Sequence, residues 1–165
     1  MATNPYFRPV RAAISTEGLA GSIYGTVTAL AVVAEVSEFK ENSASIALAA
    51  IATVLALSIS HGYANWIGMR PGGNTRADFK LVLSHEWPII TAALIVALAL
   101  VAPRLLGASE IAAVNICLAA GIAMLFALGF RASQRAGHSL RACVALATVD
   151  SLIGVVIVTI KALVH

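Results

Sequence analysis

Charged side chains are scarce in this sequence. Only 12% of its 165 residues are Asp, Glu, Lys or Arg, and 59% are hydrophobic, whereas about a quarter of a typical soluble domain is charged. This composition argues against a soluble globular enzyme. The 11 basic residues stand singly rather than in a basic cluster, so nucleic-acid binding is not expected despite the formal net charge of +3.

Cysteine and the common catalytic motifs are also nearly absent. Cys117 and Cys143 both lie in apolar runs, where a thiol behaves as a small hydrophobic group and gives no indication of the redox compartment. The sequence has no P-loop, GxSxG, HExxH or CxxC motif and no aspartate-rich motif of lipid-phosphate enzymes. We therefore expect no enzymatic activity and no permanently bound cofactor.

Five apolar runs are long enough to cross a bilayer, which takes about 20 residues per helix. They cover residues 16–36, 44–67, 87–106, 110–130 and 140–163. No stretch alternates with period two over the length of a strand, which leaves helices as the spanning elements. The sequence therefore predicts an all-α membrane protein with a single five-span transmembrane domain over residues 1–165.

Prolines and polar residues at the ends of these runs predict where the helices begin and end. Pro88 falls in the first turn of the third span, where its missing N–H costs little, and Pro103 is expected to kink or end that span near Leu106. Ser109 can cap the fourth span, with Glu110 near the positive end of its dipole.

The basic residues between the spans predict how the chain sits in the bilayer. Eight fall in the N-terminal tail and in the second-to-third and fourth-to-fifth connections: Arg8, Arg11, Arg70, Arg76, Lys80, Arg131, Arg135 and Arg141. Three fall on the other side: Lys40, Arg104 and Lys161. Because cytoplasmic loops carry the excess of Lys and Arg, we expect a cytoplasmic N-terminus and an outside C-terminus.

The connection between the second and third spans, residues 69–86, allows two interpretations. It opens with a Pro-Gly-Gly turn and continues with apolar residues among charges. This pattern suits either a short amphipathic helix on the cytoplasmic interface or an ordinary loop.

Asp150 is the clearest ionisable residue inside a span. It lies near the middle of the last run, where it reaches neither surface, so its carboxyl group must be protonated, paired or in contact with water or a cation. Thr148 and Ser151 share one face and can help to solvate it. Asp150 is either a transport-site carboxylate or a structural group hydrogen-bonded to another helix.

Polar residues also follow one face of each of the first two spans. In the second span Ser58, His61 and Asn65 recur at spacings of three and four. His61 can take up a proton or bind a metal, although a lone histidine is more often a packing residue. In the first span Glu17 and Tyr24 follow one face. Glu17 is either a carboxylate at the mouth of a cation path or a first-turn acid favoured by the helix dipole.

The first span also contains GSIYG, in which Gly21 and Gly25 form a GxxxG pair. This pair lets another helix approach closely and makes self-association plausible, although such faces are common packing devices. Glu86, which precedes the third span, offers with His85 and His138 a metal-ligand spacing that matches no strong signature.

Four stretches resemble the vacuolar iron transporter family. They are RAAISTEGLAGSIYGTV, ALSISHGYANWIG, EWPIITAALIVALALVAPRLLG and ALGFRASQRAGHSLRACVALATVDSLIG. Members of that family are described as five-span, homodimeric exporters of ferrous or manganous ions in exchange for protons. Ile59 stands where the family has its second-span methionine, and the family's long Glu-rich cytoplasmic segment is missing here.

The resemblance implies a homodimer in the lipid bilayer that exchanges Fe²⁺ or Mn²⁺ for protons. It carries Glu17 over as a transport-site acid. The residues themselves add Tyr24, His61 and Asp150 as candidates for transport or proton coupling, with Glu17, His61 and Asp150 as metal ligands that suit these ions. Two alternatives stay open: a noncatalytic helical-bundle subunit that does not transport, and a proton or small-solute channel.

Overall fold

The computed structural model describes residues 16–39, 42–68 and 75–163. The helices are α2 (Thr16–Val36), the 3₁₀ turn η2 (Ser37–Phe39), α3 (Ser43–Gly68), α4 (Thr75–Leu105), α5 (Glu110–Arg135) and α6 (Leu140–Leu163). No strand occurs in the part of the chain that the structure describes. Each of the five α-helices is long and apolar enough to cross a membrane, which confirms the predicted fold class.

The helix boundaries agree with the sequence at most ends. Helices α2 and α6 have the predicted limits, and α3 is one residue longer at each end. Helix α5 continues five residues past the predicted end at Phe130 and stops before Gly137, whose φ of +78° favours glycine. As predicted, Ser109 caps α5, since its hydroxyl oxygen accepts a 3.2 Å hydrogen bond from the backbone N–H of Ala112.

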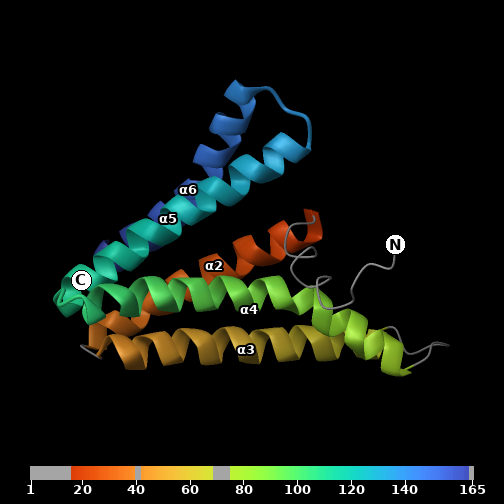
Figure 1. Ribbon diagram of the computed structural model, residues 1–165, viewed down its shortest axis with the longest axis horizontal. Helices are drawn as coiled ribbons and strands as arrows, with labels where there is room; N and C mark the ends of the chain where they lie inside the picture. The colour runs from red at the N-terminus through yellow and green to blue at the C-terminus, as the bar shows by residue number, and fades with distance from the viewer. Residues whose placement is uncertain (1–15, 40–41, 69–74, 164–165) are drawn as a thin grey trace.

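Helix α4 differs from the prediction. Its backbone is helical from Thr75 onward and continues without a break into the third span, so residues 75–86 form neither a loop nor a separate interfacial helix. Pro88 therefore lies inside a 31-residue helix rather than in its first turn. Figure 1 shows a bend in the first half of α4, the half that contains this proline. The helix ends two residues after Pro103, as predicted.

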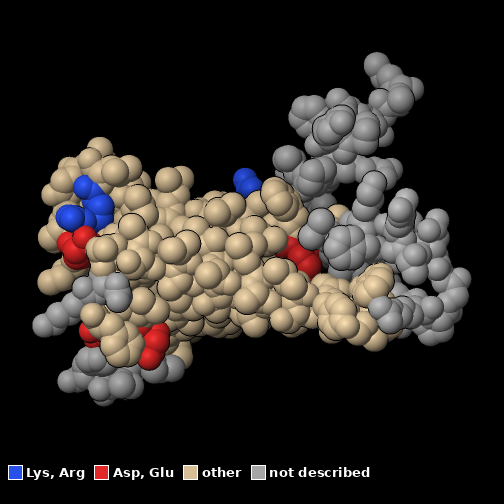
Figure 2. All heavy atoms as spheres, turned by 90° about the horizontal axis from the view of Figure 1, so that it is seen from below, with Lys and Arg blue, Asp and Glu red and all other residues tan. Residues whose placement is uncertain are grey.

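The five helices form an up-and-down bundle around α2, which packs against each of the other four. Helices α5 and α6 form an antiparallel hairpin. Figure 1 shows this hairpin close to α2 and α4 at the end of the α4–α5 turn and diverging from them toward the opposite end. On the face shown in Figure 2, charged side chains gather at the end of the α4–α5 turn, and a broad uncharged belt follows.

Small residues let the helix backbones approach closely. A Cβ built on Gly25 would lie 2.4 Å from the carbonyl oxygen of Ile89, so α2 and α4 are in backbone contact there. A Cβ built on Gly121 of α5 would clash with the side chain of Leu30, so α2 packs closely against α5 there. The GSIYG face thus accepts another helix, as the pattern indicates, but that helix is α4 of the same chain.

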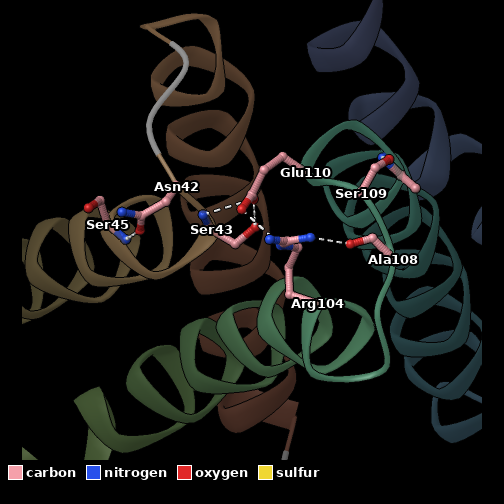
Figure 3. A network of polar contacts seen from close by, with 8 residues as sticks. Asn42, Ser43, Ser45, Arg104, Ala108, Ser109 and Glu110 are labelled. Carbon is pink, nitrogen blue, oxygen red and sulfur yellow. Dashed lines mark hydrogen bonds and ion pairs between the residues drawn. The ribbon is translucent and has the colours of Figure 1, made fainter.

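A polar cluster joins three helix ends where the bundle is tightest (Figure 3). The Oε2 atom of Glu110, on α5, accepts hydrogen bonds from the backbone N–H of Ser43 (3.0 Å) and from its hydroxyl. The Oε1 atom of Glu110 lies 2.8 Å from Nε of Arg104 on α4. Arg104 also donates to the carbonyl of Ala108. One carboxylate therefore links the start of α3, the end of α4 and the start of α5.

Candidate functional site

Two of the predicted site residues, Tyr24 and His61, come together between α2 and α3. Their rings stack with centroids 5.8 Å apart and an interplanar angle of 24°. His61 is exposed and the Tyr24 side chain is 39% exposed. The stacking contact thus covers one face of the imidazole, and the rest of the side chain is exposed. A neutral imidazole can bind a metal through a ring nitrogen.

Helix α4 reaches the same level of α2 through Pro88 and Ile89. A Cβ on Gly21 would lie 3.3 Å from side-chain atoms of both residues, and Gly25 meets the Ile89 backbone. Tyr24 lies between these two glycines in the chain. The stacked pair therefore lies at the level of α2 at which α4 also contacts α2.

Glu86 brings a carboxyl group into this region. It is three residues before Ile89 and only 6% of its surface is exposed, although it opens a 20-residue apolar span. An ionisable residue at this position is costly unless its charge is satisfied, and such residues commonly mark functional sites. The sequence spacing could have indicated this burial, because Glu86 begins a series of residues three and four apart that share one face of α4. All of them are buried: Glu86, Ile89, Ala93, Val96 and Leu100.

Ser58 lies one turn from His61 on α3. It is 3% exposed, and no described residue forms a hydrogen bond with its hydroxyl oxygen. The sequence placed Ser58, His61 and Asn65 in one polar stripe. The structure divides that stripe, because Ser58 is buried whereas His61 and Asn65 are exposed.

Asp150 lies in the seam between α6 and α5, away from the stacked pair. A Cβ on Gly129 of α5 would be 2.1 Å from Oδ2 of Asp150, so the carboxyl group packs directly on this glycine. The expectation that Thr148 and Ser151 solvate Asp150 was wrong. Their hydroxyls donate to carbonyls of their own helix, those of Val144 and Thr148, at 2.8 Å each.

The structure does not join the predicted metal ligands into one site. Helices α3 and α6, which carry His61 and Asp150, are not among the helix pairs that pack closely. Glu17 is the second residue of α2, and its side chain lies outside the described part. No group of three or more His, Cys, Asp or Glu side chains with metal-binding geometry occurs among the described residues. His61 and Asp150 therefore belong to separate positions.

No protein-family model, curated protein or solved structure matches this chain. The resemblance to the vacuolar iron transporter family stays a prediction from the four sequence stretches. What the fold defines is a class: a helical bundle with five helices that can span a membrane.

Proposed function

We propose that this protein is a multi-pass membrane transporter that exchanges a divalent cation, Fe²⁺ or Mn²⁺, for protons. The observation that carries the proposal is the position of Asp150. Its carboxyl group lies in the middle of an apolar helix on Gly129, and no described residue offers it a hydrogen bond or an opposite charge. A carboxylate so placed is costly unless it is protonated, paired or in contact with water or a cation, and ionisable residues inside a span commonly mark substrate or proton pathways.

The separation of the polar groups supports a division of roles. Asp150 takes up and releases the proton in the α5–α6 seam, because a single carboxylate provides too few ligands for a divalent ion. The stacked Tyr24 and His61 lie in the other half of the bundle. Glu17, at the beginning of α2, is the entry acid. Imidazole and carboxylate ligands suit Mn²⁺ and Fe²⁺ better than soft, thiolate-selected metals.

The proposed orientation has the N-terminus in the cytoplasm. Arg131 and Arg135 lie in the last turns of α5, and Arg141 lies in the first turn of α6, so the three belong to one connection. At the opposite end Arg104 is neutralised by Glu110. The excess of positive charge therefore favours the α5–α6 connection as cytoplasmic.

The proposed oligomer is a homodimer, as the resemblance implies. The GSIYG motif does not support it, because α4 of the same chain covers that face. The dimer contact would have to use other surfaces.

The test is a flux assay in liposomes with purified protein, Mn²⁺ or Fe²⁺, and an imposed proton gradient. The wild-type protein is expected to move the metal with an opposing proton flux, and Asp150→Asn is expected to abolish the proton dependence. Glu35→Gln is the matched control, because Glu35 is an exposed acid near the C-terminal end of α2.

Two results would contradict the proposal. Wild-type proton coupling in Asp150→Asn would remove the assignment of Asp150. Absence of flux for every metal of the panel, with the helical fold intact, would favour the alternative of a noncatalytic subunit that uses its small residues and Asp150 only for packing.

A further inference from the structure

We infer that Arg131 and Arg135 bind the headgroup of an anionic phospholipid whose acyl chains lie along the exposed apolar face of α5. This lipid site goes beyond the proposed transport function and does not depend on it. Two observations carry it: a pair of arginines whose charge no described residue neutralises, and the apolar helix face that leads to them.

Arg131 and Arg135 are four residues apart near the C-terminal end of α5, so they lie one above the other on one side of the helix. Both are exposed. Two like charges at this spacing repel each other. Within residues 16–39, 42–68 and 75–163, no side chain or carbonyl forms an ion pair or a hydrogen bond with either guanidinium group. The positive charge of the pair is therefore available to an external anion.

The arginine at the end of α4 has a different environment. Nε of Arg104 lies 2.8 Å from Oε1 of Glu110, and Arg104 also donates to the carbonyl of Ala108. Asp150 does not neutralise Arg131 in this way, because it packs on Gly129. Gly129 is two residues before Arg131, about 200° around the helix, and so lies on nearly the opposite side of α5.

The arginine pair lies at the depth of the lipid phosphates. Glu110 begins α5 in the polar cluster with Ser43 and Arg104, and residues 111–130 carry no charge. At a rise of about 1.5 Å per residue this stretch is about 30 Å long, the thickness of a hydrocarbon core. Arg131 therefore lies where the core ends, and Arg135 lies about 6 Å further out, among the headgroups.

The face of α5 that leads to the arginines is apolar. Its residues recur at spacings of three and four, and all of them are exposed: Ile116, Ala120, Ala123, Ala127, Arg131 and Arg135. A free phosphate ion would use only the arginines. A phospholipid uses the whole face, because its phosphate meets the arginines and its acyl chains meet the apolar residues.

Charge complementarity favours a lipid over a second copy of the chain on this face. Two copies related by a two-fold axis along the membrane normal have equal residues at equal depth, so their arginine pairs would meet and repel. An anionic headgroup instead neutralises the pair, and a guanidinium group can bind phosphate oxygens through two N–H groups. In the proposed orientation this end of α5 faces the cytoplasmic leaflet, which carries the anionic lipids.

The experiment measures which lipid lies beside α5, by tryptophan quenching in phosphatidylcholine vesicles that contain brominated phosphatidylserine or brominated phosphatidylcholine. The reporter is Ala127→Trp, one turn before Arg131, in the full chain with Trp66 and Trp87 replaced by Phe. We expect stronger quenching by phosphatidylserine. Replacing each arginine by Gln is expected to lower the relative affinity for phosphatidylserine about fivefold, the scale on which one basic residue near an anionic surface acts.

Two controls separate this site from a general attraction of the membrane surface. Because Asp150 packs on Gly129 in the antiparallel hairpin, Ile153 of α6 lies at nearly the depth of Ala127, and it is 44% exposed. Ile153→Trp is expected to show no preference between the lipids. Arg141→Gln removes one positive charge from the same connection, but on α6, and is expected to leave the preference at Ala127→Trp nearly unchanged.

Equal quenching of Ala127→Trp by the two lipids, or a preference that survives the loss of both arginines, overturns the site. An equal loss of preference in Arg141→Gln also overturns it, because surface potential alone then attracts the lipid. Quenching of Ile153→Trp but not of Ala127→Trp would show that a second copy covers this face, against the lipid site. If Ala127→Trp does not fold, Ala120→Trp on the same face is the reporter, and the same outcomes decide.

Discussion

Oδ2 of Asp150 lies so close to Gly129 that a methyl group built on this glycine would be 2.1 Å from it, and 3.0 Å from Cβ of Asp150. Gly129→Ala is therefore expected to destabilise the protein by about 1–3 kcal/mol, as overpacking does. Rotation of the carboxyl group relieves only part of the clash, because Cβ of Asp150 cannot move away. Thermal unfolding in detergent measures the effect.

The partner of this substitution is Asp150→Ala, which removes the clashing carboxyl group. In that background Gly129→Ala is expected to cost clearly less, so the two changes are not additive. Ala123→Val adds volume on the exposed side of α5 and is expected to stay within about 0.5 kcal/mol of the wild type. An unfolding temperature of Gly129→Ala equal to that of the wild type would contradict the close contact.

The two glycines of GSIYG are predicted to differ in their tolerance of a side chain. In Gly25→Ala the new methyl meets the backbone oxygen of Ile89 at 2.4 Å, so α2 and α4 must separate, at a cost of about 3 kcal/mol. In Gly21→Ala the nearest atoms are side-chain carbons at 3.3 Å. The gain of about 1 kcal/mol in helix propensity offsets that smaller clash.

Unfolding in mixed detergent micelles, read by circular dichroism, compares the two alanine variants. Equal stability of the two would show that α4 does not contact α2 through Gly25, and the assignment of GSIYG to internal packing would then be lost.

The sequence predicts the membrane class and four of the five helices well because both depend on local composition. Length and hydropathy define a span, and Ser109 caps α5 as its residue type indicates. Helix α4 shows where local reasoning ends. Pro88 resembles a first-turn proline, but the helix begins at Thr75 and continues through it with a bend. Tertiary contacts with α2 at Pro88 and Ile89 accompany this continuation.

The candidate site was only partly predictable, because its geometry depends on which helices are neighbours. The spacing of polar residues identified Tyr24 and His61, but nothing in the spacing says that they stack across α2 and α3. The spacing of Thr148 and Ser151 suggested that their hydroxyls would bind Asp150. In the helix these hydroxyls instead donate hydrogen bonds to backbone carbonyls of α6. The burial of Glu86 depends on how the helices pack together, which sequence spacing alone does not reveal.

The polar cluster around Glu110 is predicted to derive its strength mainly from Ser43 rather than from Arg104. Arg104 and Glu110 are 38% and 40% exposed, so water screens their ion pair and leaves it weak. Ser43 is 4% exposed and donates twice to the same carboxylate oxygen. Hydrogen bonds to a charged group are stronger than those between neutral groups, and the hydrogen bond from the Ser43 hydroxyl is the main cause that lowers the pKa of the Glu110 carboxyl group.

Double-mutant cycles separate the two contributions. The coupling energy between Ser43→Ala and Glu110→Gln should exceed that between Arg104→Gln and Glu110→Gln, and only the second should fall when salt is added. A larger coupling for the Arg104 pair would mean that the ion pair, not the serine, joins the helix ends.

The proposed orientation predicts opposite labelling of the two turns that flank α5. In a background with Cys117 and Cys143 replaced by Ala, Leu106→Cys and Gln134→Cys place one thiol at each exposed end. A membrane-impermeant maleimide added to intact cells should label Leu106→Cys only, whereas permeabilised cells should show both. The physical reason is the arginine excess in the α5–α6 connection, which resists translocation, while Arg104 at the opposite end is paired with Glu110. Labelling of Gln134→Cys alone in intact cells would invert the topology, and with it the side from which Glu17 receives the cation.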